Sequence, residues 1–194
     1  KEIKGSHISI VVPGGTTPKY FFHGLAQANI DWRKISLILS DERMVPVHHQ
    51  DSNYGGIKKT LLENLSEENI PIIIPDMENF SETNYEKFLY ETNLSLKENL
   101  PIKHAFLGLG SDGHTASLFP GNEMASINGE PYFYIFSQEN EYQRITLSMD
   151  FLQQIPNITF LVSGISKNSP LKIILDSHEV NEKSPAHQLI EQSN

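Results

Sequence analysis

A glycine-rich turn in the middle of the chain is followed directly by an acid and an imidazole. Residues 108–114 read Gly-Leu-Gly-Ser-Asp-Gly-His, and residues 105–107 before them are apolar. Glycine lets the backbone turn tightly and approach a ligand closely. An imidazole titrates near neutral pH, so His114 can take a proton from water, and Asp112 is near enough to orient its ring. The pattern predicts an acid–base site presented by a loop.

The same three glycines also satisfy the Gly-x-Gly-x-x-Gly spacing of dinucleotide-binding loops. That fingerprint needs a crossover helix after the third glycine and an acidic residue about 20 residues further on. Here Pro120 and Gly121 interrupt the chain seven residues after the third glycine. Ser111 is not in a Gly-x-Ser-x-Gly nucleophile turn either, because position 109 is leucine. We therefore expect acid–base chemistry rather than a nucleotide site or a serine nucleophile.

Residues 13–18, Pro-Gly-Gly-Thr-Thr-Pro, join an expected strand to an expected helix. The backbone N–H groups of Gly14, Gly15 and Thr16 would lie at the positive end of the helix dipole, which suits a phosphate. The same segment also reads as an ordinary turn in which Thr16 or Thr17 caps the helix. The spacing alone does not separate these two interpretations.

Charged residues gather after the second expected strand. Residues 40–43, Ser-Asp-Glu-Arg, place Asp41 and Arg43 just beyond it, and Asn53 precedes a helix. An isolated cluster of this kind is usually solvated surface. Position favours a site, because the segment falls at the same edge of the sheet as both glycine loops. Asn53 either reaches that cleft or caps its helix.

Arg144 and Lys167 are single cations beside expected strands, and each alone reads as solvated surface. Lys167, however, stands at the start of a helix, where the dipole disfavours a cation, and a bound anion would explain it. The pair His48-His49 lacks the spacing of a helical metal pair and no third ligand is evident, so we expect no metal site.

Composition restricts the class of protein. A length of 194 residues suits one domain, so we expect residues 1–194 to form a single unit. With 38% hydrophobic residues, no membrane-spanning run and no cysteine, we expect a globular, cytoplasmic protein. The net charge of −9 argues against nucleic acid and anionic membranes as partners. An anionic small molecule would need local cations.

Short apolar runs alternate with amphipathic stretches along the chain. The expected strands are 8–12, 35–39, 72–74, 105–109, 132–136, 145–147 and 158–162. Helical stripes are expected over 18–28, 57–65, 85–96 and 171–175, with a last turn opened by Pro185. This alternation predicts an α/β fold with a mostly parallel sheet covered by helices on both faces. In such sheets ligands bind beyond the carboxyl ends of the strands.

Together these segments resemble the 6-phosphogluconolactonase family, within the glucosamine-6-phosphate isomerase/6-phosphogluconolactonase superfamily. They fall in family order between Val12 and Lys167. The matching pieces are 14–18 (Gly-Gly-Thr-Thr-Pro), 40–46 (Ser-Asp-Glu-Arg-Met-Val-Pro), 52–54 (Ser-Asn-Tyr), 107–121, 144–147 (Arg-Ile-Thr-Leu) and 164–167 (Gly-Ile-Ser-Lys). The most specific are 40–46 and Asp-Gly-His-Thr-Ala-Ser-Leu-Phe-Pro at 112–120. The resemblance implies a single three-layer α/β domain of modified Rossmann-like type.

The resemblance also implies hydrolysis of 6-phospho-D-glucono-1,5-lactone to 6-phospho-D-gluconate in the oxidative pentose phosphate pathway, without metal or organic cofactor. His114 would be the general base acting on water. Asp112 and Asp41 would orient and polarise the imidazole or substrate hydroxyls. Arg43 would stabilise the developing oxyanion, helped by N–H groups of the glycine loop. The residues expected to hold substrate and phosphate are Gly14, Gly15, Thr16, Asn53, Gly110, Arg144 and Lys167. The expected partner is the sugar phosphate, and the expected assembly is a monomer or weak homodimer.

Two other functions stay open at this point. The related glucosamine-6-phosphate deaminases share the first loop and an Asp-Gly-His, but they resemble this chain less after His114. A non-catalytic sugar-phosphate sensor would need the phosphate cradle but not His114. Family members also carry a helical segment before the first strand and a closing strand after the last helix, so we expect either a short variant or missing ends.

Overall fold

Most strands and helices form where the apolar patterning predicts them. The computed structural model describes residues 7–65, 70–75, 77, 80, 82–121, 133–136, 142–175 and 184–191, so Tyr132 of one expected strand lies outside the described residues. The strands are β1 (Ile8–Val12), β2 (Ile35–Leu39), β3 (Asp41–Arg43), β4 (Ile72–Ile73), β5 (Ile102–Gly108), β6 (Phe133–Phe136), β7 (Arg144–Leu147) and β8 (Ile158–Leu161). The helices are α1 (Pro18–Ala26), α2 (Asn53–Thr60), α3 (Tyr85–Lys97), α4 (Met149–Leu152), α5 (Asn168–Leu175) and α6 (Pro185–Glu191). Short 3-10 helices are η1 (Trp32–Lys34), η2 (Leu62–Asn64), η3 (Glu82–Asn84) and η4 (Ile165–Lys167).

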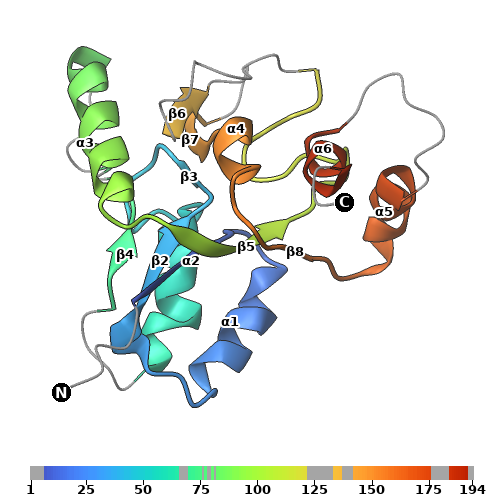
Figure 1. The fold of residues 1–194 in the computed structure, drawn as a ribbon, viewed down its shortest axis with the longest axis horizontal. Coiled ribbons are helices and arrows are strands. Elements are labelled where there is room, and N and C mark those ends of the chain that lie inside the picture. Colours follow the sequence, from blue (N-terminus) through green and yellow to red (C-terminus); the bar gives the residue numbers. More distant parts are fainter. Residues whose placement is uncertain are drawn as a thin grey trace.

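The main sheet is parallel, with the strand order β4-β2-β1-β5-β8 (Figure 1). β1 pairs with β2 from Ile8 opposite Ile35 to Val12 opposite Leu39. Because these strands are parallel, their carboxyl ends meet at one edge of the sheet. The predicted α/β class is confirmed, and the segments that follow β1, β2, β5 and β8 lie at this edge.

Successive side chains of the central strands face two separate hydrophobic clusters. Val12 lies in a cluster with Phe22 of α1 and Ile57 of α2, whereas its neighbour Val11 lies in a cluster with Phe88 of α3. The second cluster also takes in residues of α4, α6 and β7. Since neighbouring residues of a strand point to opposite faces, helices cover both sides of the sheet and the fold has three layers (Figure 1). Among the described helices, none is both long and apolar enough to cross a bilayer.

A second, antiparallel sheet adjoins the first, in the order β3-β7-β6. The sequence predicted two of these strands without placing them, and it treated residues 40–43 as a segment that follows a strand. Ser40 connects the sheets, because its N–H donates to Val12 O (2.9 Å) while its carbonyl accepts from Leu147 N (2.9 Å). Asp41–Arg43 is therefore itself a short strand, paired with Arg144–Thr146 of β7.

Candidate active site

A cavity of about 290 Å³ opens at the carboxyl ends of the main strands. Its walls come from the turn after β1, the junction of β2 and β3, the glycine-rich turn after β5, and the segments at the ends of β8 and η4. The predicted site residues that line it are Gly14, Gly15, Thr16, Asp41, Arg43, Asn53, Gly110, His114, Arg144 and Lys167. The parallel topology thus brings together residues from distant parts of the chain. Asp112, the remaining predicted residue, is connected to the cavity through His114.

The lining of this cavity suits an anionic organic ligand. Arg43, Arg144 and Lys167 supply three cations, and His114 supplies a titratable ring. A larger groove of about 570 Å³ beside α3 has neither an imidazole nor a guanidinium among the described residues that line it. Within the described part of the chain, no three His, Asp or Glu side chains are grouped so that they could hold a metal ion.

The loop after β5 holds His114 against Asp112. The Nδ1 atom of His114 lies 2.6 Å from Oδ1 of Asp112, and the backbone N–H of His114 donates to the same oxygen (3.1 Å). Burial raises the pKa of Asp112, but the hydrogen bonds and charge of His114 together outweigh burial, so the pKa lies below its ordinary value. The carboxylate therefore stays charged beside the imidazole at neutral pH. Nε2 is left as the ring nitrogen that can take a proton.

Two glycines of this loop are required by space and by backbone conformation. A Cβ at Gly110 would overlap the His114 ring. Gly113 has φ +84°, and a Cβ there would overlap Ser184, which precedes α6. Ala186 N of α6 also donates to Gly113 O (3.2 Å), so this helix supports the loop from behind. A dinucleotide-binding loop would continue into a helix after Gly113, but no helix begins within residues 114–121.

Asp41 joins the same loop to β3. Its Oδ1 accepts from Ser40 Oγ (2.9 Å) and its Oδ2 from Ser117 Oγ (2.7 Å). Ser117 N in turn donates to Thr146 Oγ1 (3.1 Å) of β7. Asp41 therefore ties the loop to the second sheet, while Asp112 accepts the hydrogen bond from the imidazole.

Two arginines lie opposite each other on paired strands of the second sheet. Arg43 of β3 and Arg144 of β7 are direct partners in the antiparallel register, and both line the cavity. Like charges directly opposite destabilise a sheet, and a bound anion would offset this repulsion. Arg43 is anchored through Nη1, which donates to Asp51 O (2.8 Å) and Asn53 Oδ1 (3.2 Å).

Phe119 packs against both the imidazole and the second arginine. Its ring centroid lies 4.6 Å from that of His114, and the Cζ atom of Arg144 lies 5.7 Å from the same centroid. The imidazole and the guanidinium thus pack against the same ring, which belongs to the segment 112–120 singled out in the sequence.

Lys167 and Asn53 are two further predicted residues that line the cavity. Lys167 of η4 donates from Nζ to Leu109 O (2.6 Å), which holds the ammonium group across the ends of β5 and β8. Thr17 occupies the N-cap position of α1 without a side-chain cap bond. Ser52, rather than Asn53, caps α2, because its Oγ accepts from Gly55 N. Asn53 instead reaches the cleft.

Glu42 holds the backbones of two cavity residues, Arg43 and Asn53, and sequence patterning did not single it out. It is only 2% exposed, and its carboxylate accepts hydrogen bonds at the junction of β3 and α2. Burial raises the pKa of Glu42, and the hydrogen bonds that it accepts offset only part of this rise. Because Glu42 stands between Asp41 and Arg43, its local sequence is typical of an exposed position, and nothing in it indicates burial.

Comparison with known proteins decides the family. The model of the glucosamine-6-phosphate isomerases/6-phosphogluconolactonase family matches residues 2–194. The chain belongs to this family. A 6-phosphogluconolactonase from Haemophilus influenzae is 34% identical over 191 residues, which cover 94% of this chain and 79% of the relative. One from Synechocystis is 32% identical over 189 residues, covering 92% and 75%.

The fold agrees with this membership. The crystal structure of 6-phosphogluconolactonase from Thermotoga maritima matches the chain with a TM-score of 0.78 at 27% identity, covering 95% of this chain and 81% of the other. The predicted family and its layered α/β fold are therefore confirmed. The roles assigned to individual residues of the cavity stay predictions.

Proposed function

We propose that this chain hydrolyses 6-phospho-D-glucono-1,5-lactone to 6-phospho-D-gluconate, the reaction that the names of its relatives indicate. One observation carries the proposal within this chain. His114, with Asp112 at its Nδ1 atom, lines a cavity that also holds three cationic side chains. Hydrolysis of a phosphorylated lactone requires a base that activates water and cations that hold the phosphate, and this cavity contains groups suited to both.

In the proposed mechanism, Nε2 of His114 takes a proton from water as the water oxygen attacks the lactone carbonyl carbon. The carbonyl oxygen becomes an oxyanion, which Arg43 and N–H groups of the glycine loop at Gly110 stabilise. Collapse of this intermediate breaks the bond from the carbonyl carbon to the ring oxygen, and the imidazolium returns its proton to that oxygen. General base catalysis of this kind contributes about 100- to 10,000-fold.

Gly15, Thr16, Arg144 and Lys167 are the proposed phosphate ligands. Their placement at the carboxyl edge of the sheet supports this assignment, because N–H groups before α1 and two cations face one cavity. Local cations explain how a chain with a net charge of −9 holds an anion. Holding the phosphate away from the reacting carbon positions the ring for attack. We further propose that the enzyme is cytoplasmic and acts as a monomer or weak homodimer.

The decisive experiment follows the loss of freshly prepared lactone with and without the protein. We expect the protein to exceed the spontaneous rate, and His114→Ala to lose most of the gain while its circular dichroism spectrum is unchanged. Equal rates with and without the wild-type protein would refute the proposal.

A deaminase or isomerase is the second candidate, because the matching family model includes glucosamine-6-phosphate isomerases. Ammonia release from glucosamine 6-phosphate would identify it. A sensor would bind 6-phosphogluconate without turning over either substrate.

A further inference from the structure

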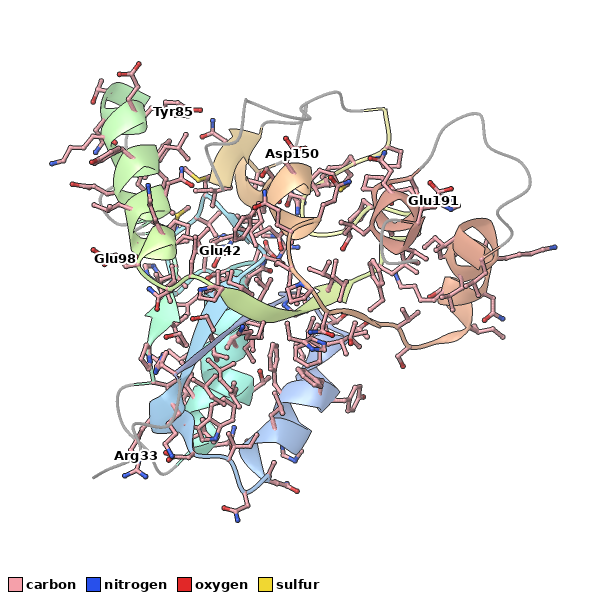
Figure 2. All side chains as sticks on the ribbon, in the orientation of Figure 1. Arg33, Glu42, Tyr85, Glu98, Asp150 and Glu191 are labelled. Atoms are coloured by element: carbon pink, nitrogen blue, oxygen red, sulfur yellow. The ribbon has the colours of Figure 1, made fainter. Side chains whose placement is uncertain are left out.

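We propose that Glu42 is a positioning residue that holds Arg43 in the orientation needed to stabilise the oxyanion. The inference rests on the proposed function, which assigns Arg43 to the lactone carbonyl. Figure 2 shows Glu42 in the middle of the molecule, whereas Arg33 lies at its periphery. A carboxylate that is 2% exposed needs several hydrogen-bond donors to compensate for lost hydration.

The carboxylate of Glu42 receives two donors at each oxygen. Oε1 accepts from the backbone N–H groups of Arg43 (2.7 Å) and Asn53 (2.7 Å). Oε2 accepts from Tyr54 N (2.8 Å) and Ser52 Oγ (3.1 Å). An ionised carboxylate only accepts hydrogen bonds, so it can satisfy all four donors at once.

Glu42, Arg43 and Asn53 are joined in a ring of hydrogen bonds, and the last two of them line the cavity. A single oxygen of Glu42 holds the backbones of Arg43 and Asn53, and Arg43 Nη1 then donates to Asn53 Oδ1 (3.2 Å). Asn53 Nδ2 donates to Asp41 O (2.9 Å), which ties this ring of hydrogen bonds back to β3. Arg43 is thus held at its backbone and at its guanidinium. The hydrogen bonds described for the Arg43 side chain engage its Nη1 atom, and the residue also lines the cavity.

Helix capping would be a simpler role for Glu42. Ser52, Asn53 and Tyr54 lie at the start of α2, where backbone N–H groups lack helical partners. Capping does not require the bond to Arg43 N in β3, nor the link between the Arg43 and Asn53 side chains. Ser52 offers a matched comparison, since it caps Gly55 N and touches Glu42, but its described hydrogen bonds do not reach Arg43.

The test compares Glu42→Gln with Ser52→Ala. A glutamine in place of Glu42 has the same size but only one acceptor oxygen, so its NH₂ group would face N–H donors. We expect kcat for the lactone to fall about 10- to 100-fold, the loss typical of a misplaced catalytic group, with KM changed less than twofold. Ser52→Ala should lower the unfolding temperature and leave kcat near the wild-type value. Equal kcat values for the two variants would overturn the proposal.

A double-mutant cycle separates positioning from general damage. In an Arg43→Ala background, Glu42→Gln should lower kcat by less than twofold, because the group through which Glu42 acts is gone. A full 10-fold loss in that background would show that Glu42 acts elsewhere. Should Glu42→Gln not fold, Glu42→Asp replaces it in the cycle, since it keeps the charge but shortens the side chain and draws the carboxylate away from Arg43 N and Asn53 N.

Binding of the product distinguishes failure of this inference from failure of the proposed function. 6-Phosphogluconate presents a carboxylate where the lactone has its carbonyl, so Glu42→Gln should weaken its binding about tenfold and leave the affinity for inorganic phosphate unchanged. If Glu42→Gln weakens product binding in this way but the wild-type protein has no lactonase activity, the proposed function is refuted, while the finding that Glu42 positions Arg43 for a bound carboxylate is kept. A wild-type protein that neither hydrolyses the lactone nor binds 6-phosphogluconate would refute both.

Discussion

The imidazole of His114 and its own backbone N–H both contact one oxygen of Asp112, at 2.6 Å from Nδ1 and 3.1 Å from N. The ring cannot turn away without breaking its bond to the oxygen that the backbone N–H also contacts. This geometry explains why the acid stands two residues before the histidine, and it leaves Nε2 for water. The two side chains are 32% and 48% exposed, so water has direct access to the pair.

Asp112→Asn should lower kcat about 10- to 100-fold, less than for the buried acid of a serine protease triad, because this carboxylate is about half exposed. An amide cannot stabilise the imidazolium that forms when His114 takes the proton. Initial rates of lactone loss above the spontaneous rate measure the effect. Asp150→Asn on α4 makes the same change of charge away from the cavity and should leave kcat unaltered. A wild-type kcat in Asp112→Asn would rule out a role for this contact.

The Asp112–His114 contact should make stability depend on pH. The folded pKa of Asp112 lies below its ordinary value, so the contact stabilises the fold above about pH 4 and this contribution disappears as pH falls through the folded pKa. Urea unfolding of the wild type and Asp112→Asn should therefore differ at pH 7 and converge as the pH falls through the folded pKa of Asp112. A difference that grows on acidification would contradict the sign of the shift.

Gly110→Ala should abolish most activity, because a Cβ at this position would overlap the His114 ring and displace it. A shift of about 1 Å in a catalytic group can cost roughly 100-fold in rate. Gly24→Ala is the matched control, since a Cβ there has no neighbour within 4 Å. It lies inside α1, where alanine should raise stability by up to about 1 kcal/mol. Full activity in Gly110→Ala would show that the ring tolerates displacement.

Lys167→Met should raise KM with little change in kcat, because the proposed phosphate contact is made equally in substrate and transition state. A hydrogen bond to a charged group contributes about 1.5 to 3 kcal/mol, so KM should rise roughly 10- to 100-fold. Lys58→Met, on the exposed face of α2, removes the same charge and should leave KM unchanged. Steady-state kinetics of both variants provide the measurement, and equal KM values would remove Lys167 from the phosphate site.

Much of the fold was predictable from local patterning. The run 8–12 became β1 with the expected bounds, and the run 35–39 became β2, because buried parallel strands are continuously apolar. The short strand β3 was not predicted, since Asp41, Glu42 and Arg43 carry no apolar signal. β3 pairs with β7 next to Ser40, whose backbone bonds to Val12 and to Leu147. The contact with Leu147 spans about 100 residues of sequence, so no local pattern predicts it.

The sequence by itself determined which residues are available for chemistry, and the order of motifs that indicates the family. Spacing also determined that Asp112 lies next to His114, because two residues within a tight loop cannot be far apart. Only the tertiary structure decided that Arg43 lies opposite Arg144, that Asp41 bonds Ser117, and that Glu42 is buried. These relationships arise from strand pairing and from the start of α2, where distant segments are brought together to satisfy backbone and charged groups removed from water.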